Sequence, residues 1–223
     1  MGSPSTNKVS IQIQMGGDSE VALTYADEHL CLGDGVGLQE RNKVGEKDRR
    51  GEAEDLAYIV QKQASEWLHE GSEVRLQGPS VRQPWRRPST GFLKINTDGS
   101  FSTNTGSGGW GFVIRDELTT IAHAGAGSCQ YLLSAFHCEL LACVQGVMEA
   151  VKQGMSRVLL ETDSQMVKMA FETNMFALAD TGGIVYELKN MISSSFVEFK
   201  FLFTPRTCNS VAHVVAAFGC TCS

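Results

Sequence analysis

Three acidic residues in the second half of the chain stand where their carboxylates could share a metal ion. Asp98 ends an alternating apolar run that begins at Phe92, and Asp163 follows the short apolar run 157–161. Glu139 falls in the second turn of a long helical pattern between them. Magnesium takes hard oxygen ligands and keeps several waters, so carboxylates that leave positions open for phosphate oxygens suit it. On spacing alone, three acids on a solvated sheet edge are the commoner arrangement.

The elements that must position these acids alternate between strands and helices after Gly91. Ser134 and Ser164 are suited to cap two of the helices, and Gly154 is suited to end the first. The order of elements predicts an α/β fold with a mixed five-stranded sheet flanked by helices. The predicted strands are 92–98, 110–115, 118–124, 157–161 and 196–203, and the predicted helices are 134–154, 164–172, 183–192 and 209–218.

The residues before this domain show a different pattern of apolar and polar residues. Apolar residues near the start are too scattered to keep a period, apart from the short alternation of Val9, Ile11 and Ile13. Apolar residues then recur at helical spacing, and a segment rich in proline and glycine follows. The chain is therefore divided into a mostly flexible N-terminal tail (1–51), an amphipathic helix (52–70), a linker (71–90) and the α/β domain (91–223).

Composition and charge are those of an ordinary globular protein. The 223 residues are 42% hydrophobic and 20% charged, which leaves room for one domain of about 100 to 150 residues with a smaller appendage. A secretory signal and an apolar run of roughly 18 residues are both missing, so we expect no membrane partner and an intracellular location, cytoplasmic or nuclear. The seven cysteines lack paired spacing and indicate neither a disulfide framework nor a zinc module.

The net charge of -6 is spread over the chain. Neither the first 88 residues nor the remainder forms a basic arm, and nucleic-acid affinity depends largely on neutralising phosphates. Any contact with nucleic acid should therefore be modest and sensitive to salt.

Six short motifs occur in the later part of the chain. They are WRRP from Trp85, LKINTDGS at 93–100, GWGFVIRD at 109–116, HCELLA at 137–142, LLETDSQMV at 159–167 and NSVAH at 209–213. Each motif alone is weak, but in this order and combination they resemble the plant-type RNase H-like domain, which is related to the RNase H modules of reverse transcriptases. The resemblance covers roughly residues 92–219 and implies an RNase H-like fold for 91–223.

The resemblance also implies a role for each acid. Asp98 resembles the aspartate that bridges two magnesium ions, Glu139 the helical glutamate that binds one of them, and Asp163 the second aspartate. The implied reaction is hydrolysis of the RNA strand of an RNA:DNA hybrid, with two Mg²⁺ about 4 Å apart and Mn²⁺ as an alternative ion. The 2'-hydroxyl groups mark the RNA strand.

The last motif departs from the pattern of the active enzymes. Where they resemble N-x-x-x-D, this chain has Asn209 followed by His213, so an imidazole replaces the fourth carboxylate. A neutral imidazole binds magnesium poorly but can shuttle protons, and a histidine hydrogen-bonded at the start of a helix is an equal alternative. We expect Arg206 to contact phosphate, and we assign Asn209 to nucleic-acid contact as well.

Two functional hypotheses follow. The first is a magnesium-dependent ribonuclease acting on RNA:DNA hybrids, and the second is a module derived from a retroelement that kept the fold and binds nucleic acid or protein without turnover. An exonuclease of the same superfamily is less favoured, because no fourth acid stands in the last helix. Trp110 is interpreted as core, and Trp85 with the two arginines after it either touches phosphates or docks on the domain.

Overall fold

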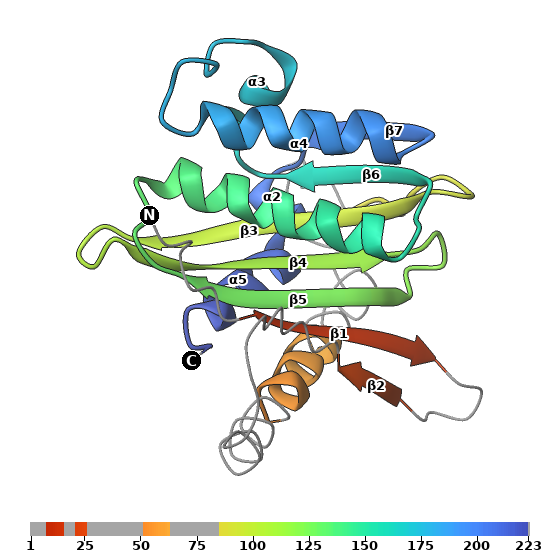
Figure 1. The fold of residues 1–223 in the computed structure, drawn as a ribbon. Helices are drawn as coiled ribbons and strands as arrows, with labels where there is room; N and C mark the ends of the chain where they lie inside the picture. The colour runs from red at the N-terminus through yellow and green to blue at the C-terminus, as the bar shows by residue number, and fades with distance from the viewer. Residues whose placement is uncertain (1–7, 16–20, 26–50, 63–84, 223) are drawn as a thin grey trace, which may run out of the picture.

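The computed structural model describes residues 8–15, 21–25, 51–62 and 85–222. Within them, one sheet has the order β2-β1-β5-β4-β3-β6-β7 (Figure 1). The strands are β1 (Lys8–Met15), β2 (Val21–Tyr25), β3 (Leu93–Ser102), β4 (Ser107–Arg115), β5 (Ile121–Cys129), β6 (Arg157–Thr162) and β7 (Glu198–Phe203). The helices are 51–62, α2 (Ala135–Lys152), α3 (Gln165–Glu172), α4 (Gly182–Ser195), the short η1 (Arg206–Cys208) and α5 (Ser210–Gly219).

The five strands from β3 to β7 form the predicted mixed sheet. β3, β4 and β5 pair antiparallel as a meander, whereas β3, β6 and β7 run parallel to one another. The expected start of the third strand at Leu118 is wrong, because Asp116 closes a turn by accepting hydrogen bonds from the backbone N–H groups of Leu118 and Thr120. β5 therefore begins only at Ile121.

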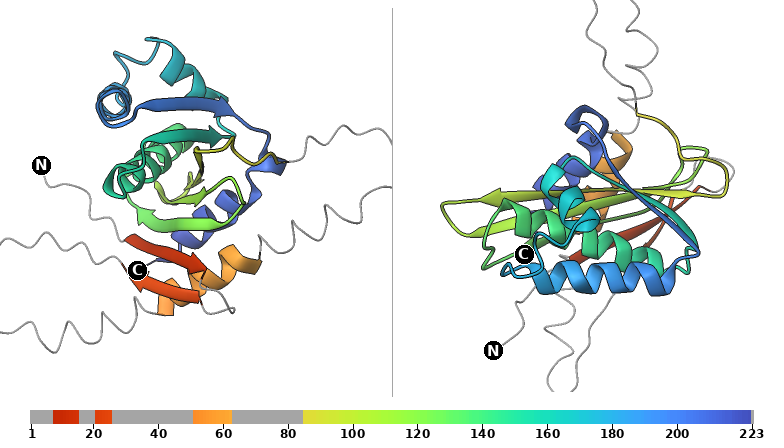
Figure 2. Two further views of the ribbon diagram at one scale, coloured as in Figure 1. Left: turned by 90° about the vertical axis from the view of Figure 1, so that its right-hand side faces the viewer. Right: turned by 90° about the horizontal axis from the view of Figure 1, so that it is seen from above.

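Helices cover both faces of the sheet. α2 lies on one face and α5 on the other, while α3 and α4 lie on the α2 side near β6 and β7 (Figures 1 and 2). The core under α2 contains Trp110, Phe112 and Leu140, so the interpretation of Trp110 as a core residue is confirmed. Among the described residues, no helix is both long and apolar enough to span a membrane.

A second core lies under α5 and includes residues that precede the domain. Ile11 of β1 is 2% exposed and pairs with Ala124 of β5, so the expectation of a flexible tail is wrong for residues 8–15 and 21–25. β1 pairs with the otherwise open edge of β5, and hydrophobic burial offsets the entropy of ordering it. The alternation around Ile11 was the signal for this strand. Residues 1–7, 16–20 and 26–50 lie outside the described residues.

The expected amphipathic helix is present at residues 51–62, where the buried side chains include Leu56 and Val60. These side chains join the same core as Val215 of α5. Residues 63–84, which hold the rest of the predicted helix and most of the predicted linker, lie outside the described part of the chain. The face under α5 is thus closed by a segment that precedes the domain.

α5 approaches the sheet closely because β4 carries glycine beneath it. A Cβ atom at Gly111 would lie 2.4 Å from the backbone nitrogen of Ala216 and 2.7 Å from the carbonyl carbon of Val215. Backbone atoms cannot yield as a flexible side chain can. A side chain at this position would therefore push α5 away from β4.

We predict that Gly111→Ala destabilises the protein by about 1–3 kcal/mol, the usual cost of overpacking a filled core. The free energy of unfolding in urea measures the effect. Gly183→Ala is the matched control, because Gly183 lies in α4 and a methyl group added there would have no atom within 4 Å. There, alanine should be neutral or slightly stabilising, since it favours helix over glycine. Equal unfolding midpoints for the two variants would show that α5 does not pack this tightly.

Candidate metal centre

Asp98, Glu139 and Asp163 converge beside the interior strands β3 and β6 of the sheet. Each offers one carboxylate oxygen, and these three oxygens lie within 4.8 Å of one another. β3 and β6 are parallel neighbours in which Thr97 stands opposite Thr162, so the residues that follow them, Asp98 and Asp163, are also adjacent. The predicted meeting of the three acids is therefore seen in the structure.

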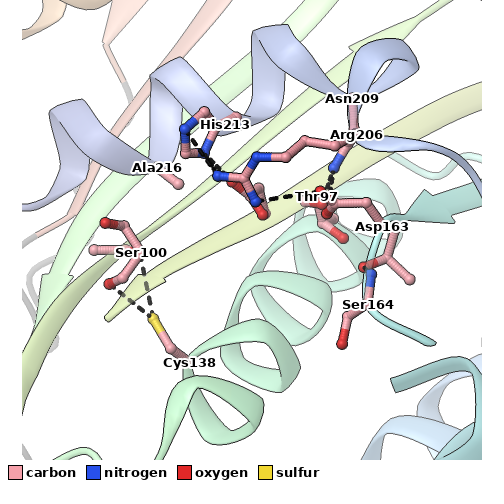
Figure 3. Close-up of polar contacts among 12 residues, drawn as sticks. Thr97, Ser100, Cys138, Asp163, Ser164, Arg206, Asn209, His213 and Ala216 are labelled. Carbon is pink, nitrogen blue, oxygen red and sulfur yellow. Dashed lines mark hydrogen bonds and ion pairs between the residues drawn. The ribbon is translucent and has the colours of Figure 1, made fainter. Parts of the chain in front are cut away.

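Glycine at position 99 lets α2 bring Glu139 close to β3. A Cβ atom at Gly99 would lie 2.7 Å from the backbone nitrogen of Glu139. Cys138, one residue earlier, donates from its Sγ toward the carbonyl oxygen of Ser100 at 3.4 Å (Figure 3). The start of α2 is capped by Ser134, whose hydroxyl accepts from the backbone N–H of His137 at 3.2 Å. The second turn of α2 is thus fixed directly beside Asp98.

Asp98 is buried and the other two acids are half-buried, and two of the carboxylate oxygens are unsatisfied. Asp98 is 1% exposed, and neither its Oδ1 nor Oε2 of Glu139 has a hydrogen-bond partner among the described residues. Burial, followed by the charges of Asp98 and Asp163, raises the pKa of Glu139 to about 9. Burial and then Asp163 raise the pKa of Asp98, while His213 and Arg206 oppose that shift. Two buried oxygen ligands without partners fit a hard divalent cation such as magnesium.

His213 and Arg206 lie on the other side of Asp98. Nδ1 of His213 is 2.7 Å from Oδ2 of Asp98, in a hydrogen bond that the carboxylate accepts when this nitrogen is protonated. The guanidinium of Arg206 is 2.9 Å from the imidazole ring, and its Nη1 is 3.6 Å from Oδ2 of Asp163 (Figure 3). The structure thus places two sequence-predicted residues, His213 and Arg206, next to the three acids.

Asn209 is placed differently from our expectation. It is 1% exposed, and its amide donates to the carbonyl oxygen of Thr97 at 2.9 Å and to Oδ1 of Asp163 at 3.1 Å (Figure 3). The prediction that Asn209 contacts nucleic acid is therefore wrong, because the packing of α5 on β3 buries this side chain. Its amide instead fixes the orientation of Asp163.

A buried polar network behind Asn209 was not predicted. Asn96 donates to the side chains of Asn209 at 3.2 Å and Glu161 at 3.1 Å, and Glu161 forms an ion pair with Lys94 at 2.6 Å. Lys94 and Asn96 share a face of β3 with Asp98, since alternate residues of a strand point the same way. The polar residues at every second position were the available signal.

Trp85, which precedes β3 in the chain, packs over this network. Its indole N–H donates to Oδ1 of Asn96 at 3.4 Å, and its ring lies under Lys94 and Arg115, with the cationic groups 4.9 and 5.3 Å from the ring centroid. Of the two alternatives for Trp85, docking on the domain is the one observed. The chain of contacts runs from Trp85 through Asn96 and Asn209 to Asp163.

Comparison with known proteins agrees with this fold. Residues 96–219 match the family described as reverse transcriptase-like, which is more than half of the chain, so the chain belongs to that family. The fold is RNase H-like. No curated protein matches the chain.

Solved RNase H structures share the fold at low sequence identity. The N-terminal RNase H domain of a Mycobacterium tuberculosis protein, solved as a fusion with maltose-binding protein, is 21% identical with a TM-score of 0.51 over 58% of this chain and 94% of that one. RNase H1 from the archaeon Halobacterium salinarum is 21% identical with a TM-score of 0.50 over 59% and 99%. LC11-RNase H1, isolated from compost by a metagenomic approach, is 20% identical with a TM-score of 0.51 over 60% and 100%.

The raised pKa of Glu139 predicts a pH-dependent stability in the absence of metal. The folded state keeps a proton on Glu139 up to about pH 9, whereas the ordinary pKa is 4.5. The contribution of Glu139 to stability is therefore highest below pH 4.5 and is lost as pH rises toward 9. In EDTA, we predict that Glu139→Gln raises the Tm and flattens its decline between pH 6 and 9.

Thermal unfolding followed by circular dichroism measures this effect. Glu187→Gln, an exposed substitution on α4, is the matched control and should follow the wild-type profile. Each kcal/mol corresponds to about 2–4 °C in a protein of this size. Parallel pH profiles for wild type and Glu139→Gln would show that Glu139 is not held in a site that penalises its charge.

Proposed function

We propose that this protein is a magnesium-dependent endoribonuclease that hydrolyses the RNA strand of RNA:DNA hybrids. The observation that carries the proposal is the convergence of Asp98, Glu139 and Asp163 beside the interior strands β3 and β6 of an RNase H-like sheet, with two buried carboxylate oxygens lacking partners among the described residues. Magnesium, or Mn²⁺ in its place, would activate a water and offset the negative charge that develops on the leaving 3'-oxygen.

The residues of the chain hold the site rigid for this chemistry. Asp98 is fixed in the centre of the sheet, Glu139 is fixed by the close contact of α2 with Gly99, and Asp163 is oriented by Asn209. A phosphodiester needs close alignment of the attacking water and the leaving oxygen, and rigid elements provide such alignment better than loops do. The placement of all three acids therefore supports hydrolysis.

Arg206 and His213 supply the polar groups nearest to an incoming phosphate. The side chain of Arg206 is 62% exposed beside Asp163, so its guanidinium can turn outward and donate two hydrogen bonds to a phosphate. The ring of His213 is partly exposed beside Asp98, so it can also contact an incoming phosphate. Both contacts would bring the scissile phosphate toward the carboxylates.

A module that binds nucleic acid without turnover is the second candidate. The observation that favours it is that His213 and Arg206 already pair with Asp98 and Asp163, in a chain whose net charge is -6. Such internal pairs reduce the demand of the carboxylates for a cation. The two candidates differ in a single measurable quantity, the rate of hybrid cleavage.

Asp98→Asn tests the proposal. The substitution keeps the shape and removes a charge, so cleavage of a labelled RNA:DNA hybrid in Mg²⁺ or Mn²⁺ should fall by at least about 100-fold, with circular dichroism unchanged. Asp180→Asn, an exposed substitution before α4, is the matched control and should cleave like wild type. Cleavage by Asp98→Asn at the wild-type rate would refute the assignment. A wild-type protein that binds the hybrid but cleaves it with neither ion would establish the second candidate.

A further inference from the structure

We infer that the metal centre holds one divalent cation, and that the guanidinium of Arg206, together with His213, takes the place of a second. This inference rests on the proposed metal site and revises the two ions that the family resemblance implies. The inference depends on which carboxylate oxygens have no partner among the described residues and which already face a basic or amide group.

Asp98 has only one oxygen to offer. A carboxylate that bridges two cations gives one oxygen to each, but Oδ2 of Asp98 is held by Nδ1 of His213 at 2.7 Å. Its Oδ1 is buried and has no partner among the described residues. Asp98 is 1% exposed, so water has little access to this oxygen. The free oxygen points to one cation, and a second cation bridged through Oδ2 would have to displace the His213 ring from that oxygen.

Glu139 has a free oxygen like that of Asp98, whereas both oxygens of Asp163 already face a donor. Oε2 of Glu139 is buried and unpartnered within the described residues, like Oδ1 of Asp98. Oδ1 of Asp163 accepts from Asn209, and its Oδ2 faces Nη1 of Arg206 at 3.6 Å. A carboxylate oxygen that accepts one hydrogen bond keeps a second lone pair, so Oδ1 of Asp163 can still bind a cation beside Oδ1 of Asp98 and Oε2 of Glu139. The side of the cluster nearest α5 is occupied by Arg206 and His213.

The charges of the residues at the site also indicate a single divalent cation. Once a bound cation displaces the proton of Glu139, three carboxylates face one guanidinium, which leaves two negative charges for one divalent cation to balance. A second divalent cation would leave an excess of positive charge among buried groups, which costs desolvation energy without a compensating partner. An additional carboxylate at position 213 would supply the missing charge, but this chain has an imidazole there. This chain therefore lacks both the fourth carboxylate and the second cation, and Arg206 and His213 occupy the place of that cation.

The number of bound ions is measured with Mn²⁺ on the full chain. Equilibrium dialysis gives the stoichiometry, and electron paramagnetic resonance distinguishes an isolated Mn²⁺ from two coupled ions a few ångströms apart. Wild type should bind one Mn²⁺ per chain and show the isolated-ion spectrum. The double variant Arg206→Ala/His213→Asp removes the guanidinium and supplies a fourth carboxylate, so it should bind two ions with a coupled spectrum.

Arg157→Ala is the matched control. Arg157 is also exposed and paired with a carboxylate, Glu198 at 3.1 Å, but it begins β6 whereas Asp163 follows the end of that strand. Removing this arginine should leave one ion bound. If it instead creates a second site, then net charge alone sets the number of ions and the inference is wrong.

The number of Mn²⁺ ions bound by the wild-type protein tests the inference even if the double variant does not fold. Two coupled ions in the wild type would overturn it and leave the proposed hydrolysis standing. A wild type that binds no Mn²⁺ would overturn both. A wild type that binds one Mn²⁺ but cleaves no hybrid would refute the proposed hydrolysis and support the inference. If the double variant folds and binds only one ion, then Arg206 and His213 do not occupy the position of a second cation.

Discussion

Mutual repulsion among three closely spaced carboxylates, one buried and two half-buried, is the constraint on which the rest of this domain depends. Their oxygens lie within 4.8 Å of one another in a place with little access to water, where like charges are most costly. The polypeptide must hold them there against that repulsion. Parallel pairing of β3 with β6 and the contact between α2 and Gly99 provide the rigidity, because a shift of either element would separate the acids.

Basic and amide groups that reduce this repulsion come from the C-terminal part of the domain. His213 and Asn209 lie at the start of α5, and Arg206 lies in the short helix before it. Their positions depend on how α5 lies against the sheet, which in turn depends on Gly111. The core under α5 also contains Leu56 from the helix at 51–62 and Ile11 from β1. Residues that precede the family-matched region therefore contribute to the geometry of the site.

Local patterns were sufficient to predict the acids and the elements that carry them. Asp163 follows the end of an apolar strand and Glu139 follows a capping serine, features encoded within a few neighbouring residues. The expectation that the first strand ends at Asp98 is wrong, because pairing with β4 extends β3 to Ser102. Asn209 could not be placed in the same way, because its amide partners Thr97 and Asp163 lie far from it in sequence. Its burial is a consequence of tertiary packing.

The N-terminal strands show the same limit. The alternation around Ile11 is too short to identify a strand alone, and only pairing with β5 makes it one. Likewise, polar residues on β3 such as Lys94 and Asn96 are typical of surface positions until Glu161 and Trp85 are seen to enclose them. Sequence patterns predict which residues form an element, whereas the partners that satisfy buried polar groups depend on the assembled fold.

The position of a bound ion is the sharpest test of the metal centre. In crystals of the wild-type protein grown with Mn²⁺, anomalous scattering locates the ion independently of any assay of cleavage. We predict a peak in contact with Oδ1 of Asp98 and Oε2 of Glu139, at about 2.0–2.3 Å, while His213 stays on Oδ2 of Asp98. An anomalous map that shows Mn²⁺ elsewhere on the protein, but no peak at the three carboxylates, would contradict the assignment of the metal centre.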